Sequence, residues 1–492
     1  MRRMLVAGLS ALLWCLLAAP GAWAAAAVRD DEPVPAVPGD LKAAEVTFRG
    51  DGGLVMHGTV LSPARGGGAR PGIVLIHGAG TGTPRTKLMG EAVEFARRGL
   101  SVLVYDKRSV GYSLFQRSYA QLAGDALGAV ATLREQPGVD PAKVGVWGLS
   151  EGGWVAPMAA ARSRDVAFVV LVGANSQQPL VQQAWAVHAG LRAAGVSGRL
   201  VDRTEPDLYR VLADGELFPE PYYDPAPTIG AVRQPVLAVW GVHDLLTPAR
   251  ESSAGFAEAL RRGGNEHLTV RYFADADHAA HRTPDRGVTR LPELAPGYAD
   301  LVGSWVTDVT SGRPPASGTS GPEPVQASPT LPVEPVDWWE AADVQLGALV
   351  VMLAGFAAYP LAALVRRVRG RFAPAGAGAV VSRRPVSAAA RLLSAGGLTV
   401  VLGSFGYVTY VVMKGGKLAS PGPLLGGRPV VWLALQALAV ACVVATAVTG
   451  LAWWRGRAGV AVGERVRLAA LLAGGLVLVP WGLYWGLLLP GM

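Results

Sequence analysis

Four long apolar segments near the end of the chain constrain its fold more than any other feature. Each holds 22 to 26 residues without a charged side chain: 344–365, 392–413, 429–454 and 468–489. About 20 apolar residues in a helix are enough to cross the roughly 30 Å hydrocarbon core of a bilayer. The sequence therefore predicts four transmembrane helices within a C-terminal membrane region, 338–492.

The loops between these segments indicate how the membrane region is oriented. The first and third loops hold eleven Arg side chains, whereas the second loop holds three basic residues, Lys414, Lys417 and Arg428. Because cytoplasmic loops carry the excess of basic residues, the first and third loops are expected in the cytoplasm. We therefore expect a multi-pass cell-membrane protein whose larger, preceding domain lies on the extracytoplasmic side.

The N-terminus agrees with export of that domain. Arg2 and Arg3 precede an apolar run that ends at the small-residue sequence AWA, which is the layout of a cleavable signal peptide over residues 1–24. Only two cysteines occur in the chain, both inside apolar segments, so no disulfide framework is available.

The charge balance differs between the two parts of the chain. From Val344 onward there are 14 Lys and Arg and one acidic residue, which leaves 31 basic and 36 acidic residues before that position. The sequence pI of about 9.6 therefore comes from the membrane loops. Because the preceding part is mildly acidic, we expect no nucleic-acid partner.

Between residues 41 and 310, short β-rich runs alternate with helix-like stretches, which is typical of a mostly parallel sheet covered by helices. An antiparallel N-terminal pair and six further strands are predicted: 45–49, 54–62, 72–76, 101–105, 143–147, 167–172, 235–240 and 268–273. Helices are expected between them, for example at 88–98 and 118–134. Near-continuous apolar runs belong to strands buried on both faces, so we predict a doubly wound α/β domain.

Two segments interrupt this pattern. Residues 177–233 are longer than an ordinary connection and contain helix-like runs, so they are predicted to form a compact helical lid inserted in the α/β domain. Residues 311–337 are rich in Pro, Ser and Gly and cannot bury a core. They are expected to form an extended or disordered linker that leads to the membrane region.

The sequence GLSEG at 148–152 follows a predicted strand and precedes a helix-like stretch. In this context, a G-x-S-x-G sequence forms a strained strand-to-helix turn that exposes the serine hydroxyl as a nucleophile. An isolated match is more often an ordinary loop, but here an aspartate and a histidine follow in the order that this fold uses. Ser150 is therefore the predicted nucleophile.

A serine hydroxyl needs a base to react, and the base needs an acid that fixes its tautomer. The candidate acid is Asp244, just past the strand 235–240, and the candidate base is His278, after the last predicted strand. His281 is an alternative base that lies farther from the strand end. His243, next to the candidate acid, is expected to be a supporting or surface residue.

Such a serine also needs two backbone donors for the oxyanion that forms during its reaction. One is expected to be the N–H of Glu151, beside the nucleophile. The other is expected to be the N–H of Ala79, in the sequence HGAG at 77–80. His77 itself is interpreted as a structural loop residue.

The sequence DKRSVGYS at 106–113 contributes a further pattern. Its Asp106 and Arg108 are interpreted as a loop-organising ion pair beside a glycine turn. Together with HGAG, GLSEGG, GVHD and ADADH, this sequence resembles the α/β-hydrolase superfamily, and more narrowly the bacterial serine esterases related to dienelactone hydrolases and the prolyl oligopeptidase catalytic domain. The resemblance covers about 44–307. It implies hydrolysis of an ester, a thioester or occasionally an amide, without a metal ion or an organic cofactor.

Two classes of function follow from these patterns. The first is a membrane-anchored serine hydrolase that cleaves carboxylic esters or thioesters of a small-molecule or lipid-like substrate; a peptidase or acyltransferase acting on cell-envelope material would use the same residues. The second is a non-enzymatic, ligand-binding domain of a membrane transport or signalling protein. The four apolar segments carry almost no ionisable residue, whereas transport sites usually need such groups. The membrane region is therefore interpreted as an anchor or a partner-binding bundle.

Overall fold

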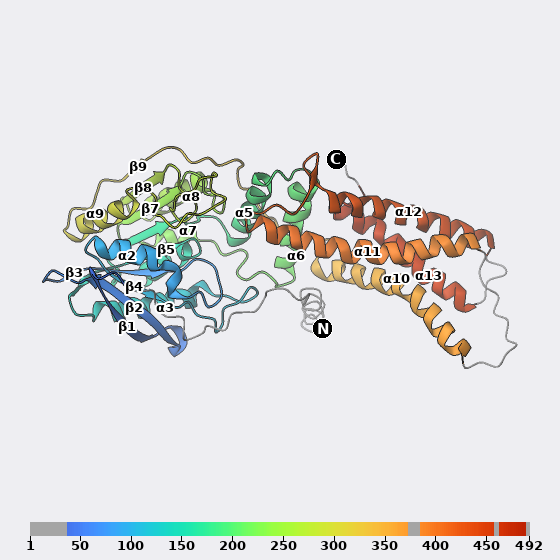
Figure 1. The fold of residues 1–492 in the computed structure, drawn as a ribbon, viewed down its shortest axis with the longest axis horizontal. Helices are drawn as coiled ribbons and strands as arrows, with labels where there is room; N and C mark the ends of the chain where they lie inside the picture. Colours follow the sequence, from blue (N-terminus) through green and yellow to red (C-terminus); the bar gives the residue numbers. More distant parts are fainter. Residues whose placement is uncertain (1–36, 372–383, 457–461, 489–492) are drawn as a thin grey trace. The chain divides into compact units, whose positions relative to one another are not determined.

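The chain forms two compact units in the computed structural model, which describes residues 37–371, 384–456 and 462–488 (Figure 1). The first, which we call the sheet unit, contains 37–189 and 216–332. The second, which we call the helical unit, contains 190–215 and the described residues from 333 onward. The predicted signal peptide, residues 1–24, lies outside the described residues.

One nine-stranded sheet organises the sheet unit, in the order β1-β2-β4-β3-β5-β6-β7-β8-β9. The strands are β1 (Leu41–Arg49), β2 (Val55–Pro63), β3 (Arg70–Ile76), β4 (Ser101–Tyr105), β5 (Val139–Leu149), β6 (Val169–Val172), β7 (Val236–Gly241), β8 (Leu268–Phe273) and β9 (Gly318–Ser320). β2 pairs antiparallel with β1 and β4, and the other neighbouring pairs are parallel. The eight strands predicted from the sequence are confirmed, with shifts of a few residues at their ends.

Helices cover both faces of this sheet. One face is covered by α3 (Tyr119–Arg134), α4 (Gly152–Arg162) and α8 (Ala249–Arg262). The other face is covered by α2 (Met89–Arg97) and α9 (Tyr298–Thr310). Successive strand residues point to opposite faces, so Val146 is buried in the first core and its neighbour Trp147 in the second. Burial on both faces explains the near-continuous apolar strands, and the fold is the predicted doubly wound, mostly parallel α/β sheet.

The order of the strands reverses at β3, which has β4 on one side and β5 on the other. In open sheets of this kind, ligands bind beyond the carboxyl ends of the strands at such a reversal. Ile76, the last residue of β3, is paired with Gly148 near the end of β5. The segments that follow, 77–80 and 150–151, therefore leave the sheet next to each other.

The Pro-rich segment after α9 contains a short strand and backbone contacts that its composition does not predict. It forms β9 beside β8, and further along Val325 N donates to Val242 O at 2.9 Å. Thr330 N donates to the carboxylate of Glu251 at 3.1 Å. An edge strand leaves backbone groups unpaired, and a neighbouring segment of the same chain can satisfy them. Composition alone does not predict this pairing.

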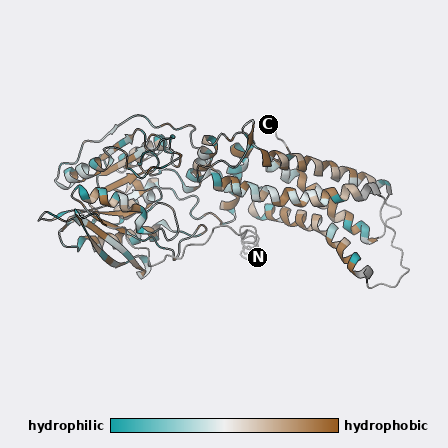
Figure 2. Ribbon diagram, in the orientation of Figure 1, coloured by the Kyte–Doolittle hydropathy of each residue, from teal (hydrophilic) through white to brown (hydrophobic). Residues whose placement is uncertain are grey.

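Four long helices dominate the helical unit and run side by side (Figure 1): α10 (Ala342–Arg371), α11 (Arg384–Gly415), α12 (Val430–Gly456) and α13 (Val462–Tyr484). Each contains a stretch that is long and apolar enough to cross a membrane. Hydrophobic residues recur along all four helices (Figure 2), and some of them, such as Val444 and Leu476, are exposed. Gly397 faces the ring of Phe356, and a Cβ at this glycine would lie 2.7 Å from that ring. Small residues thus let the helices approach closely, as in membrane bundles.

Part of the predicted lid belongs to the helical unit. Residues 190–215, inserted between β6 and β7 in the sequence, contain a π-helical turn (Leu200–Thr204) and α6 (Glu205–Asp214). Nη2 of Arg210 lies 2.6 Å from Oε2 of Glu340, and the backbone N–H of Ala342, at the start of α10, donates to the carboxylate of Asp214 at 2.8 Å. The other lid helices are α5 (Pro179–Ala193) and α7 (Ala226–Gly230). The chain consequently passes between the two units three times.

Candidate active site

Ser150 occupies a sharp turn between β5 and α4. Its φ of +56° lies in the left-handed region, which non-glycine residues adopt only under constraint. The constraint comes from its neighbours: Ser150 N donates to Val172 O at 2.9 Å, and Ser150 O accepts from Gly153 N at 2.8 Å. A Cβ at Gly152 would lie 2.7 Å from Ile76 O, so a side chain there would push the turn off β3. This geometry is that of a nucleophile elbow.

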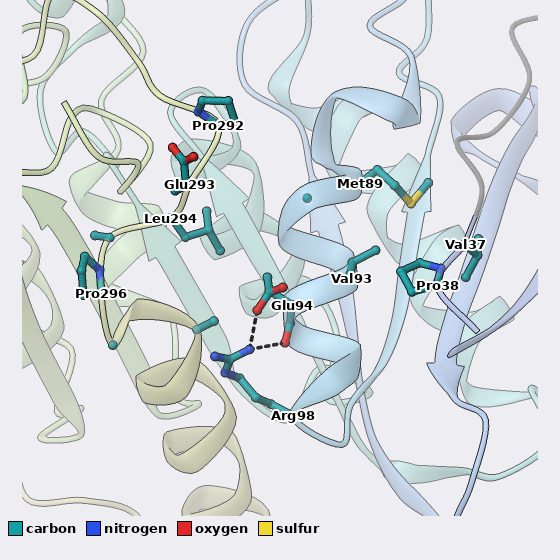
Figure 3. Close-up of a pocket in the computed structure, with 14 residues that line it drawn as sticks. Val37, Pro38, Met89, Val93, Glu94, Arg98, Pro292, Glu293, Leu294 and Pro296 are labelled. Carbon is teal, nitrogen blue, oxygen red and sulfur yellow. Dashed lines mark hydrogen bonds and ion pairs between the residues drawn. The ribbon is translucent and has the colours of Figure 1, made fainter. Parts of the chain in front are cut away.

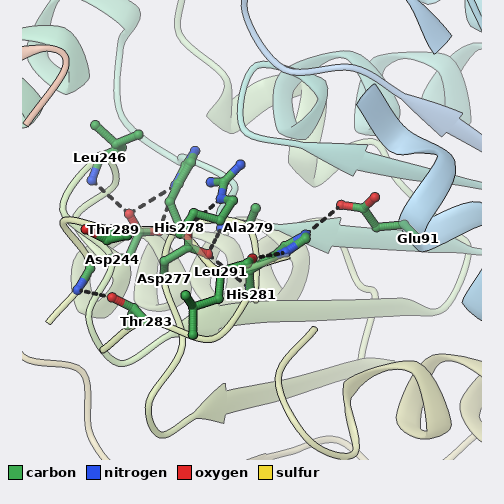
Figure 4. A network of polar contacts seen from close by, with 12 residues as sticks. Glu91, Asp244, Leu246, Asp277, His278, Ala279, His281, Thr283, Thr289 and Leu291 are labelled. Carbon is green, nitrogen blue, oxygen red and sulfur yellow. Dashed lines mark hydrogen bonds and ion pairs between the residues drawn. The ribbon is translucent and has the colours of Figure 1, made fainter. Parts of the chain in front are cut away.

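Asp244 and His278 lie against each other at the ends of β7 and β8 (Figure 4). Nδ1 of His278 is 2.9 Å from Oδ2 and 3.0 Å from Oδ1 of Asp244. The carboxylate is buried and also accepts from Leu246 N and Thr247 N, both at 2.8 Å. Because an ionised carboxylate only accepts, Nδ1 carries the proton and Nε2 is left as the basic nitrogen.

Because Gly173 has no side chain, the ring of His278 can lie close to the end of β6. A Cβ at Gly173 would lie 2.7 Å from Nδ1 of His278, so only glycine leaves room for the ring. Gly173 directly follows Val172, whose carbonyl accepts from Ser150 N. The end of β6 therefore contacts both the turn at Ser150 and the ring of His278. Among the described residues, neither Ser150 Oγ nor His278 Nε2 makes a hydrogen bond.

His281, the alternative base, points away toward α2 (Figure 4). Its Nε2 lies 3.1 Å from Oε1 of Glu91, and its Nδ1 lies 2.9 Å from Leu291 O. Burial lowers the pKa of His281, but the hydrogen bond and charge of Glu91 outweigh it, and the pKa is raised above its ordinary value. Both nitrogens are thus engaged in holding the loop, and the geometry favours His278 as the base.

The loop 77–80 lies beside Ser150. A Cβ at Gly78 would be 3.3 Å from Cβ of Ser150. Within the parts of the chain that the structure describes, neither Ala79 N nor Glu151 N donates to another group. Both amides that the sequence suggests as oxyanion donors are therefore unused and next to Ser150.

His77 fixes the start of this loop to the end of β4 by a hydrogen bond. Its Nε2 donates to Tyr105 O at 2.7 Å, and burial lowers the pKa of His77 to about 4. The neutral ring therefore acts as a fixed hydrogen-bond donor rather than a base.

The predicted ion pair between Asp106 and Arg108 is wrong. Arg108 instead forms a bidentate, buried pair with Asp125, at 2.6 and 2.7 Å. Asp106 accepts from both the backbone and the side chain of Arg85. Asp106 and Arg108 are close in sequence, but their side chains point in different directions after the strand. The local sequence does not show which partner each side chain meets.

Three residues to which the sequence analysis gives no role surround the buried carboxylate of Glu151: Lys107, Tyr112 and Arg117. Lys107 Nζ lies 2.5 Å from Oε1 of Glu151, and Arg117 Nη1 lies 2.7 Å from Oε2. Lys107 and Tyr112 lie within the DKRSVGYS sequence that the resemblance includes, and Arg117 follows that sequence. Burying an unpaired carboxylate is costly, so a glutamate buried beside Ser150 needs cations close to it. This need was the signal in the sequence that could have identified Lys107 and Arg117.

A groove of about 650 Å³ lies elsewhere in the sheet unit, between α2 and the segment before α9 (Figure 3). Met89 and Val93 line one side, and Leu294 lies on the other, with the ion pair of Glu94 and Arg98 at its edge. None of the predicted catalytic residues lines this groove. Among the described residues, no group of three or more His, Cys, Asp or Glu side chains could hold a metal ion.

The sheet topology, with a serine in the turn between β5 and α4, defines an α/β-hydrolase fold. Residues 117–294 match the prolyl oligopeptidase family, and the chain belongs to this family of α/β-hydrolases. That segment includes Ser150, Asp244 and His278.

Parts of the chain are also similar to individual proteins. The thiohydrolase aneE of Aspergillus aculeatus is 30% identical over 171 residues, which cover 33% of this chain and 52% of that protein. The uncharacterised protein Rv2307c of Mycobacterium tuberculosis is 30% identical over 229 residues, 46% of this chain and 71% of that protein. The solved structure of 2,6-dihydroxy-pseudo-oxynicotine hydrolase is 17% identical, with a TM-score of 0.41, and covers 57% of this chain and 71% of its own. The chain spans about half the length of the first curated relatives that it matches, 43% and 52%.

Proposed function

We propose that this protein is a membrane-anchored serine hydrolase that cleaves carboxylic esters or thioesters through a triad of Ser150, His278 and Asp244. The observation that carries the proposal is the convergence of three strand ends. Ser150 follows β5, Asp244 follows β7 and His278 follows β8, and Gly173 at the end of β6 leaves room for the imidazole beside the serine turn.

The residues of the site suit acyl transfer. Nε2 of His278 removes the proton from Ser150 Oγ as that oxygen attacks the acyl carbonyl, and Asp244 stabilises the imidazolium that forms. The N–H groups of Glu151 and Ala79 donate to the carbonyl oxygen as it becomes negative. The imidazolium then gives its proton to the leaving alcohol or thiol. Water, activated by the same histidine, releases the acyl group from Ser150.

An ester or thioester of a small-molecule or lipid-like compound is the proposed substrate. The name of the relative aneE, a thiohydrolase, supports acyl–sulfur cleavage by a chain of related sequence. The four apolar helices would keep the enzyme at a bilayer, where amphiphilic esters concentrate.

We further propose that the sheet unit lies on the extracytoplasmic side of the cell membrane. The Arg-rich first and third loops of the membrane region support this orientation. Alkaline phosphatase fused after Thr310 is expected to be active, and a fusion within the loop after α10 is expected to be inactive. The opposite pattern would place the sheet unit in the cytoplasm.

The test of the activity uses the full chain in detergent, since residues 190–215 tie the inserted segment to the helical unit. Hydrolysis of p-nitrophenyl esters with acyl chains of increasing length, and of a matching thioester, is compared between wild type and Ser150→Ala. Turnover by the wild type alone supports the proposal. A peptidase would instead cleave peptide anilides faster than any ester. If no substrate class is cleaved, a ligand-binding function remains.

A further inference from the structure

The peptide group between Gly78 and Ala79 is held in place by a hydrogen bond to its carbonyl oxygen. Its oxygen, Gly78 O, accepts a hydrogen bond from Nζ of Lys107 at 2.6 Å. Its nitrogen, Ala79 N, is the amide that makes no hydrogen bond among the described residues and lies beside Ser150. Because a peptide group is planar, a bond that fixes the carbonyl direction also fixes the direction of the N–H.

The next amide along the loop is occupied. Gly80 N donates to the hydroxyl oxygen of Tyr112 at 3.2 Å. This bond removes Gly80 as a competing donor and pins the far end of the loop. Ala79 N lies between these two fixed points and makes no hydrogen bond among the described residues.

The side chains of Lys107 and Tyr112, which contact the loop 77–80, both contact the carboxylate of Glu151. Lys107 Nζ lies 2.5 Å from Oε1 of Glu151, and the hydroxyl of Tyr112 lies 3.0 Å from each carboxylate oxygen. All three side chains are buried, with 4% of Lys107 and 2% of Glu151 exposed. Glu151 thus links the two proposed oxyanion donors: its backbone carries one, and its side chain fixes the residues that orient the other.

The charges in this cluster compensate one another. Lys107 and Arg117 lie against the carboxylate of Glu151, and Glu220 is a second carboxylate near Arg117. Burial lowers the pKa of Lys107, while the adjacent carboxylate opposes that shift. An ammonium on the carbonyl oxygen also polarises the peptide group, which strengthens its N–H as a donor.

We infer that Lys107, Tyr112 and the carboxylate of Glu151 are positioning residues that orient and polarise the Ala79 N–H for oxyanion binding. This inference rests on the proposed hydrolase function. None of the three side chains touches the reacting atoms, so each acts through the loop 77–80. A cluster that only stabilised the fold would show no selective effect on the transition state.

The test compares Lys107→Met and Tyr112→Phe with wild type, using kcat, KM and inhibition by a trifluoromethyl ketone, whose adduct with serine carries an oxyanion. Loss of a direct oxyanion donor typically lowers kcat by about 10²–10³-fold. Misorientation of one donor is expected to lower kcat by about 10–100-fold, with KM changed less than about twofold. The inhibition constant of the ketone should rise by the same factor as kcat/KM falls.

Asp106→Asn is the matched control, because Asp106 neighbours Lys107 in the same loop but contacts Arg85 instead of 77–80. It should leave kcat and ketone affinity unchanged. Tyr112→Phe keeps the ring and removes only the hydroxyl, so it decides the question if Lys107→Met does not fold.

Equal ketone affinity in wild type and Tyr112→Phe, whatever the change in melting temperature, would overturn the inference while wild-type turnover keeps the proposed function standing. A wild type that neither hydrolyses esters nor binds the ketone would overturn both.

Discussion

Asp244 and His278 are 34 residues apart in the chain, yet both carboxylate oxygens of Asp244 lie within 3.0 Å of Nδ1 of His278. The pair forms because β7 and β8 are adjacent and parallel, so the segments after their carboxyl ends meet at one edge of the sheet. Leu246 N and Thr247 N hold the carboxylate in place. This contact supports Asp244 and His278 as the acid and the base of the proposed triad.

Asp244→Asn should remove most of the activity while keeping the fold. An amide at this position can present its NH₂ to Nδ1, which stabilises the wrong tautomer and leaves Nε2 protonated. We expect kcat to fall by about 10⁴-fold with a small change in KM. Steady-state kinetics of the full chain on its best ester measures both values. A fall of less than about tenfold would remove Asp244 from the triad.

Substitution of the two neighbouring histidines should separate their roles. His278→Ala is expected to lower kcat by at least about 10³-fold, because the general base is lost. His281→Ala should retain activity within about tenfold but melt at a lower temperature, since Glu91 would lose its partner while buried. Kinetics and thermal melts of the two variants check this. If His281→Ala were the inactive variant, the base would be misassigned.

The buried Glu205 should make stability depend on pH. Its side chain is fully buried, neither oxygen has a hydrogen-bond partner among the described residues, and burial raises the pKa of Glu205 well above its usual value. The unfolded chain loses this proton at the ordinary pKa and the folded chain keeps it. Stability is therefore full below that ordinary pKa and falls as pH rises toward the raised value.

Glu205→Gln removes this titration. The variant should melt at a higher temperature than wild type at pH 8, by about 2–4 °C for each kcal/mol gained, and at the same temperature at pH 4. The exposed Glu334→Gln, in the same unit, is the control and should follow wild type at both pH values. A difference between wild type and Glu205→Gln that is independent of pH would contradict the prediction.

The pair of Arg108 and Asp125 should contribute to stability much more than a surface pair. Its side chains are only 4% and 1% exposed, so Asp125→Ala leaves a buried, uncompensated guanidinium and should lower the free energy of unfolding by about 3–5 kcal/mol. Asp300→Ala, which breaks an exposed pair with Arg98, should cost less than about 1 kcal/mol. Denaturant melts of both variants give the two values. Equal losses would show that burial is not the deciding factor.

The sequence predicts the sheet and the sharp turn at Ser150 because both depend on local patterns. Apolar runs mark the strands, the GLSEG sequence marks the turn at Ser150, and the position of a residue after a strand indicates which edge of the sheet it occupies. The choice between His278 and His281 needed the structure, because three residues of loop decide which ring faces Asp244.

Features that depend on pairing between distant segments were not predictable. The strand β9 forms from a Pro-rich segment because β8 offers an unpaired edge, and composition does not carry that information. Residues 190–215 group with the four long apolar helices although they interrupt the α/β pattern in sequence. Likewise, Arg108 pairs with Asp125 on α3 rather than with its neighbour Asp106, since side-chain direction after a strand follows from tertiary packing.

The most direct test of the account is covalent labelling of the full chain with a fluorophosphonate, followed by mass spectrometry of the modified peptide. The account predicts a single adduct on Ser150, formed much more slowly in His278→Ala and absent in Ser150→Ala. No adduct on the wild-type chain, or an adduct on another serine that persists in Ser150→Ala, would contradict the claim that Ser150 is an activated nucleophile.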